Sequence, residues 1–82
     1  MNEETIRTLD KILPVVERVH GEHHPELHRV AALYAELKAA PSAEVFSQLR
    51  QTTGDYTVPV DACPTFEKTY ALLRSLDETF AR

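Results

Sequence analysis

Five prolines are spread through the 82-residue sequence, and they limit the length of any regular element. Pro25 and Pro64 each precede a run of periodic apolar residues, which is typical of a proline in the first position of a helix. Pro41 ends the run between them, because a proline drives the residue before it out of helical geometry. These breaks predict four helical segments joined by three connections.

The first segment should begin at Asn2, whose side chain can cap a helix with Glu3 and Glu4 in its first turn. Side chains suited to a core then recur every three or four residues, which is one face of a helix. They are Ile6, Leu9, Leu13, Val16 and His20, with Ile12, Val15 and Val19 expected to widen this face. Pro14 removes a backbone hydrogen bond to Asp10, so it should either kink this helix or divide it into two shorter pieces, and we expect a kink.

Similar stripes predict three further helices: one from Pro25, one capped by Ser42 and ending near Gly54, and one from Pro64. Their predicted buried positions are Leu27, Val30, Tyr34 and Leu37, then Val45, Phe46 and Leu49, then Phe66, Tyr70, Leu73, Leu76 or Asp77, and Phe80. Short connections make neighbouring helices run in opposite directions. The sequence therefore predicts an all-α fold, a small antiparallel four-helix bundle forming one domain over residues 1–82.

Charge and composition limit the partners of such a domain. The formal net charge is -4 and no basic run occurs, so a face that could displace counterions from nucleic acid or an anionic membrane is not expected. The single cysteine, Cys63, excludes an internal disulfide, and no apolar run approaches a signal segment or membrane span. We expect a cytoplasmic protein whose partner is another protein or a second copy, because so small a core is marginal alone.

The stretch VHGEHHPELH, residues 19–28, contains all four histidines. In an antiparallel bundle the first and third connections lie at the same end, so this stretch should face GDYTVPVDAC, residues 54–63. The side chains that could converge there are His20, His23, His24, Asp55, Tyr56, Asp61 and Cys63. Among them, His20, His23, His24 and Cys63 are candidate ligands of a single transition metal such as zinc, copper or nickel.

A structural interpretation of the histidines competes with the metal hypothesis. The glycine and proline inside the stretch break its helical spacing, so a metal site would have to be assembled across the loop. His20 could instead complete the core stripe or cap the first helix, where a cation is favoured. His24 would then precede the second helix as an N-cap-like residue, and His23 and His28 would be solvated.

The other loop has the same two interpretations. Cys63, at the start of the last helix, is either a reactive thiol or a small side chain tucked against the core. Tyr56 and Asp61 could shape a pocket, or they could serve as a loop anchor and a helix-capping acid. No Ser/His/Asp arrangement, H-E-x-x-H motif or glycine-rich phosphate loop occurs, so we expect no enzymatic activity.

Two blocks of the sequence resemble a known family. VERVHGEHHPELHRVAALYAELKA is similar to the VHG...HPEL segment of the hemerythrin-like iron-sulfur cluster repair di-iron proteins, the repair of iron centres family. FSQLRQTTGDYTVPVDACPTFEKTYALLRSLDE is similar to their later LR.LT..YT.P..AC.T...LY..L..LE segment. The order of the blocks is preserved. The resemblance implies a four-helix bundle with a non-haem di-iron site and a role in restoring iron-sulfur clusters damaged by nitric oxide or oxidants.

The iron ligands of that family have no counterpart here. The first ligand histidine would lie further upstream than the residues before His20 allow, and the second-helix H-x-x-x-E pair is absent because Pro41 closely follows the matched LYAELKA. The third-helix histidine would fall near Ala39, and the last H-x-x-x-E pair would begin just after Arg82. The missing ligands belong to the start of the first helix, the end of the second, the start of the third and the end of the fourth. These four helix ends meet at one end of an antiparallel bundle, so the resemblance implies a hemerythrin-like bundle shortened from its iron-bearing end.

Three functions from different classes follow from these residues. The leading one is a non-enzymatic relative of the repair proteins that has lost the di-iron ligands and acts as a binding or regulatory module in nitrosative or oxidative stress or iron-sulfur physiology. The first alternative is a mononuclear transition-metal or redox module that uses the loop histidines and Cys63. The second is a structural helical protein that self-associates, for instance as a homodimer. We expect no cofactor and no di-iron site in the leading case.

Overall fold

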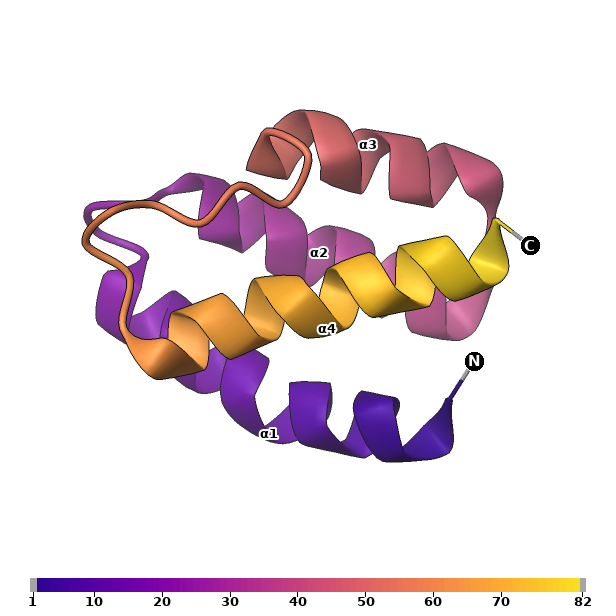
Figure 1. The fold of residues 1–82 in the computed structure, drawn as a ribbon, viewed down its shortest axis with the longest axis horizontal. Coiled ribbons are helices and arrows are strands. Elements are labelled where there is room, and N and C mark those ends of the chain that lie inside the picture. The colour runs from indigo at the N-terminus through magenta and orange to yellow at the C-terminus, as the bar shows by residue number, and fades with distance from the viewer. Residues whose placement is uncertain (1, 82) are drawn as a thin grey trace.

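The computed structural model describes residues 2–81, which form four α-helices and no strand (Figure 1). The helices are α1 (Glu3–His20), α2 (Glu26–Ala39), α3 (Ala43–Thr53) and α4 (Pro64–Phe80). α1 packs against both α2 and α4, and α2 also packs against α3. The predicted all-helical class with four helices is therefore confirmed for these residues, and their packing is compatible with a small helical bundle.

Most helix starts follow the predicted caps. The Asn2 side chain accepts hydrogen bonds from two amides in the first turn of α1, and Ser42 Oγ accepts one from the Val45 amide at 3.2 Å. Pro64 is the first residue of α4, as expected. Pro25 lies one residue before α2 rather than in its first position, because a tight turn that includes a 3.0 Å bond from the Leu27 amide to the His24 carbonyl precedes the regular helix.

Pro14 lies inside α1, which continues across it as one helix from Glu3 to His20. The proline is exposed, and so is Asp10, whose carbonyl loses its amide donor there. Water can satisfy a carbonyl at an exposed position, which offsets part of the cost of the lost hydrogen bond, and the helix is not divided at the proline.

The core follows most of the predicted positions, although Ile6 and His20 of the first stripe are only partly buried. It comprises Leu9, Leu13, Val16, Leu27, Val30, Leu33, Tyr34, Leu37, Val45, Phe46, Leu49, Tyr56, Phe66, Tyr70, Leu73 and Leu76. Leu33 was not predicted to be buried, yet it is fully so. The expectation that Val15 and Val19 widen the core face of α1 was wrong, since they are 40% and 60% exposed. Phe80 is also 41% exposed, near the end of α4.

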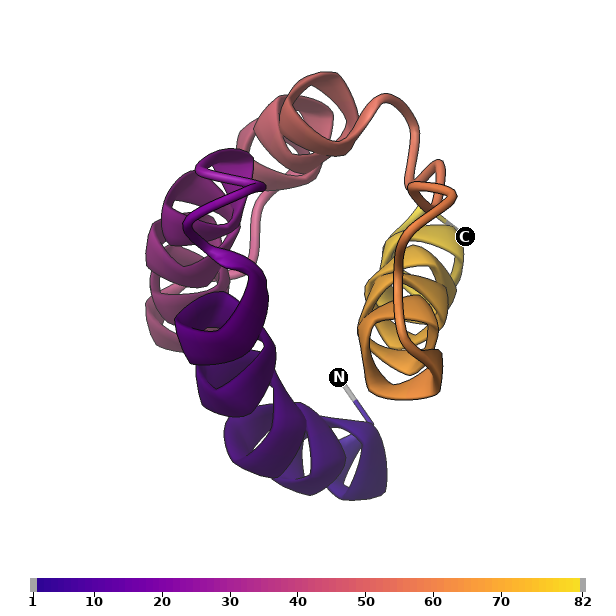
Figure 2. The same cartoon turned by 90° about the vertical axis from the view of Figure 1, so that its left-hand side faces the viewer.

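The helices place two connections at the same end of the molecule. Figure 1 shows the α1–α2 turn beside the last part of the α3–α4 loop, with both ends of the chain on the opposite side. In the end-on view, α1, α2 and α3 follow one another around an arc, and the long loop crosses from α3 to α4 (Figure 2). This arrangement brings the histidine-rich stretch next to the segment that leads into α4.

Candidate functional site

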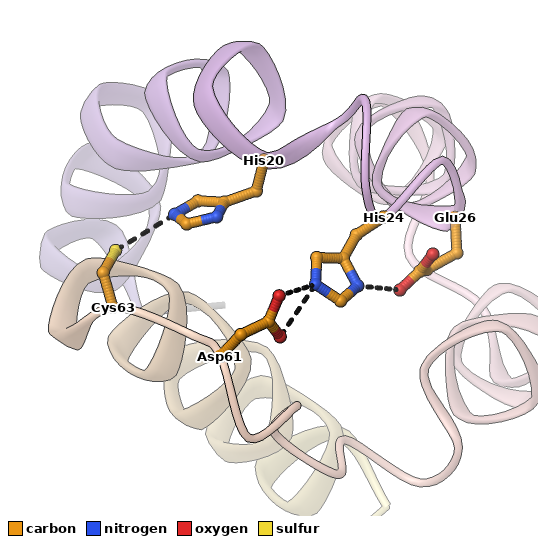
Figure 3. A network of polar contacts seen from close by, with 5 residues as sticks. All are labelled: His20, His24, Glu26, Asp61 and Cys63. Atoms are coloured by element: carbon orange, nitrogen blue, oxygen red, sulfur yellow. Dashed lines mark hydrogen bonds and ion pairs between the residues drawn. The ribbon is translucent and has the colours of Figure 1, made fainter.

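At the end where the two connections meet, His20, the last residue of α1, contacts Cys63, which immediately precedes α4. His20 Nε2 lies 3.3 Å from Cys63 Sγ in a partly buried position (Figure 3). Pro64 starts the helix, so Cys63 takes the N-cap position, but its side chain caps no amide and packs against the core instead. An imidazole nitrogen and a thiol at this distance can form a hydrogen bond.

His24 is held by two carboxylates, one from the first residue of α2 and one from the α3–α4 connection. Its Nε2 lies 3.0 Å from both oxygens of Asp61, and its Nδ1 lies 3.3 Å from Glu26 Oε2 (Figure 3). The hydrogen bond to Asp61 raises the pKa of His24, and the same bond lowers the pKa of Asp61. The arrangement therefore favours a positively charged imidazole between two negative groups.

An aromatic ring from α4 lies against both histidines. The Phe66 ring is fully buried and meets the His20 ring edge-on at 5.2 Å and the His24 ring at 5.4 Å between centroids. We call His20, His24, Glu26, Asp61 and Cys63 the loop-end junction. The polar atoms of this junction contact each other beside the buried Phe66 ring. These polar contacts and the Phe66 ring together fix the orientation of the two imidazole rings.

The remaining predicted histidines lie outside this junction. His23 is exposed, and its backbone amide donates to the His20 carbonyl at 3.1 Å within the turn. His28 is also exposed, as the structural interpretation predicted, but its Nδ1 lies 2.8 Å from Glu17 Oε2 across α1 and α2. Helix capping was one of the two roles considered for Asp61; the N-cap position of α4 is occupied by Cys63, and Asp61 bonds His24.

Asp55 and Tyr56 belong to a different region, because the chain turns sharply after α3. Gly54, Asp55 and Tyr56 all have positive φ angles, of 62°, 61° and 62°. The Thr53 hydroxyl supports this turn by accepting a hydrogen bond from the Tyr56 amide at 2.8 Å. The turn directs the Tyr56 side chain into the core, and Arg74 donates to the Asp55 carbonyl at 2.9 Å.

Tyr56 takes part in a second polar cluster, which we call the α3–α4 junction: Arg50, Tyr56 and Asp77. The Tyr56 hydroxyl donates to Asp77 Oδ2 at 2.7 Å, and Arg50 donates to both Asp77 oxygens at 2.6 and 2.7 Å. Burial raises the pKa of Tyr56, and the hydrogen bond to Asp77 raises the pKa of Arg50. Tyr56 is thus the loop anchor that the structural interpretation predicted.

The donor groups do not form an evident metal centre. Over residues 2–81, no group of three or more His, Cys, Asp or Glu side chains is arranged to hold a metal ion. The loop-end junction provides two neighbouring contacts, His20 with Cys63 and His24 with Asp61, while His23 faces solvent. Ligation of a metal by His20, His23, His24 and Cys63 stays a prediction, and it would require these groups to rearrange.

Two further observations bear on what the chain is. In the part of the chain that the structure describes, every helix is too short or too polar to cross a membrane. A comparison with protein-family models, curated proteins and solved structures finds no match for this sequence.

Proposed function

We propose that this chain is a non-enzymatic relative of the hemerythrin-like iron-sulfur cluster repair proteins, an antiparallel bundle shortened from the iron-bearing end. In this proposal it acts as a binding or regulatory module in nitrosative or oxidative stress or in iron-sulfur physiology. The supporting observation is that the two blocks that resemble the family contact each other. His20 of the VHG motif meets Cys63 of the AC motif, and His24 of HPEL meets Asp61.

The chemistry of these contacts is consistent with a structural role for the retained motifs. Each imidazole already has a polar partner and an aromatic neighbour. Among the described residues, no buried side-chain nitrogen or oxygen lacks a hydrogen-bond partner. A ligand site or catalytic site more often contains polar groups that have no hydrogen-bond partner within the protein. In this proposal the retained motifs therefore hold the two connections together at one end of the bundle. The binding function then belongs to another surface of the protein.

The loss of the di-iron ligands is tested with ferrous iron. Protein purified without a histidine tag is incubated with ferrous iron without oxygen and then exposed to air. We expect no oxo-bridged di-iron absorption, because no cluster of carboxylate and histidine ligands is available among the described residues. A hemerythrin-like protein with all its ligands serves as the positive control. Appearance of the band in this chain would overturn the argument from ligand loss.

The physiological part of the proposal is tested in a strain that lacks the gene. After a pulse of nitric oxide, we expect an enzyme that depends on a [4Fe-4S] cluster to recover more slowly in this strain than in the parent. Expression of the wild-type chain should restore the rate of recovery. Equal recovery in the deletion strain and its parent would remove the stress role and leave only the structural relationship.

The contact between His20 and Cys63 favours a second candidate, a mononuclear metal or redox module. Titration with Co²⁺, a spectroscopic substitute for Zn²⁺, separates it from the first, because cobalt bound to thiolate gives a strong charge-transfer band. The leading proposal predicts no stoichiometric binding. A stoichiometric band that disappears in both His24→Ala and Cys63→Ser would replace it with the metal module.

A further inference from the structure

The exposed side of α1 carries an apolar pair that the fold leaves uncovered. Val15 and Val19 are 40% and 60% exposed, and their spacing of four residues places them next to each other along one side of the helix. The core of α1 is instead formed by Leu9, Leu13 and Val16, which are at most 2% exposed. α1 therefore has two apolar stripes, of which only one is used within the chain.

Three cations lie beside the exposed valines. Arg7, Lys11 and Arg18 are exposed and separated by four and seven residues, so they share one side of α1 that adjoins the valine pair. None of the ion pairs found among residues 2–81 involves any of these three. We call Arg7, Lys11, Val15, Arg18 and Val19 the α1 outer face.

The acidic residues of the same helix do not neutralise this face. Asp10 is paired with Lys38 at 2.9 Å and Glu17 with His28 at 2.8 Å, and both partners lie on α2. The other exposed acids nearby, Glu3, Glu4 and Glu22, lie at the two ends of the helical stretch. The middle of the outer face is thus locally positive on a chain whose formal net charge is -4.

We propose that the α1 outer face binds an acidic amphipathic helix of a partner protein, with the two valines in contact with its apolar stripe. Charge complementarity points to this occupant, because a positive face beside an apolar stripe selects a helix of opposite pattern. A symmetric pair of copies is disfavoured, since a two-fold axis through this face would set the same cations against each other. A lipid surface is disfavoured by the overall negative charge and by the absence of large apolar anchors at the exposed valines.

This inference deepens the proposed binding role and rests on it, but its test is independent of the iron experiment. The probe is a fluorescein-labelled, alanine-based helical peptide with leucines at positions i, i+4 and i+7, flanked by glutamates. A matched peptide has lysines in place of the glutamates. Binding to the full chain is followed by fluorescence anisotropy at low and high salt.

The expected result is that the acidic peptide binds, more weakly at high salt, and that the lysine peptide does not. Arg18→Glu should weaken binding about tenfold, and Val19→Ser about threefold, since one removes a charge contact and the other an apolar contact. Lys68→Glu makes the same charge change on the exposed side of α4, away from this face, and should weaken binding less than about twofold. Circular dichroism of each variant checks that the helices are retained.

Three outcomes would overturn the inference. The first is no binding of the acidic peptide, or equal losses for Arg18→Glu and Lys68→Glu. The second is binding to vesicles of phosphatidylserine and phosphatidylcholine that is lost in Arg18→Glu, which would assign the face to membranes. The third is a dimer in sedimentation that Val19→Ser converts to a monomer, which would assign the face to a second copy. None of them alters the iron result, so failure here is distinct from failure of the proposed family relationship.

Discussion

The loop-end junction and the α3–α4 junction both join distant segments through a carboxylate, yet they differ in burial. Asp61 of the first is 59% exposed by side chain, whereas the side chain of Asp77 in the second is 9% exposed. Exposed ion pairs contribute little because water and salt screen them, while a buried carboxylate that accepts three hydrogen bonds is costly to disturb. The histidine-rich stretch thus attracts attention in the sequence, but the less conspicuous junction should carry more of the stability.

The largest expected effect is that of Asp77→Ala. This change leaves the buried Tyr56 hydroxyl without its acceptor and Arg50 without its partner, so the free energy of unfolding should fall by about 2–3 kcal/mol. Urea denaturation followed by circular dichroism measures it. Glu78→Gln, at the exposed neighbouring position, is the control and should change stability by less than about 0.5 kcal/mol. Equal effects of the two changes would mean that the α3–α4 junction adds little stability and would remove its advantage over the loop-end junction.

A smaller effect is expected for Gly21→Ala in the α1–α2 turn. A Cβ atom at Gly21 would clash with the Glu17 carbonyl oxygen and lie 3.0 Å from the His28 ring, so the turn must shift. We expect a loss of about 1–2 kcal/mol in thermal unfolding. Gly54→Ala tests a different cause, because nothing surrounds that position but its φ is +62°. An unchanged melting temperature for Gly21→Ala would mean that the turn is less closely packed than described.

Asp61→Asn should have a smaller effect that depends on pH. The pKa of His24 is raised above 6.5, so the stability that this bond provides is present below that value and is lost as pH rises through the raised pKa. The pKa of Asp61 is lowered below 3.8, so its share is present above that value and is lost as pH falls through the lowered pKa. The melting temperature of the variant should fall further below wild type at about pH 5.5 than at about pH 8.5. A difference that grows towards alkaline pH would contradict the assignment.

His23→Ala should have the smallest effect in this region. The side chain is exposed and the contribution of the residue to the turn comes from its backbone amide, which alanine retains. Stability should change by less than about 0.5 kcal/mol in urea. A loss as large as that of Gly21→Ala would indicate that His23 belongs to the loop-end junction after all.

Local signals predicted most of the fold. Asn2, Ser42, Gly54 and Pro64 act within one turn of their own position, so the ends of the helices could be inferred from neighbouring residues. Periodicity likewise identified the buried stripes and left Leu76 and Asp77 as alternatives, and the structure buries both. These features depend on the chain only over short distances.

The exposure of particular side chains and their pairing could not be predicted from the sequence, because they depend on which helix faces other helices cover. Val15 and Val19 have the spacing of core residues, but the packing of α2 and α4 decides which side of α1 is covered. The topology correctly placed the two connections at one end, and His20, His24, Asp61 and Cys63 meet there. Asp55 and Tyr56 do not, because three consecutive positive φ angles turn the chain towards α4 before it reaches that end. Pairing between individual side chains required coordinates.

The pattern of helix packing divides the molecule into two pairs, α1 with α4 and α2 with α3. Along one side the pairs are joined by direct packing of α1 on α2. On the other side, α3 and α4 are connected by side chains, namely the Asp77 hydrogen bonds and the Phe46 and Phe80 rings, whose centroids are 5.0 Å apart. When the fold opens, the two pairs should therefore separate first between α3 and α4, while α1 and α2 stay packed against each other. Hydrogen exchange would then report earlier exposure of the amides around residues 54–57 than of those in the middle of α1.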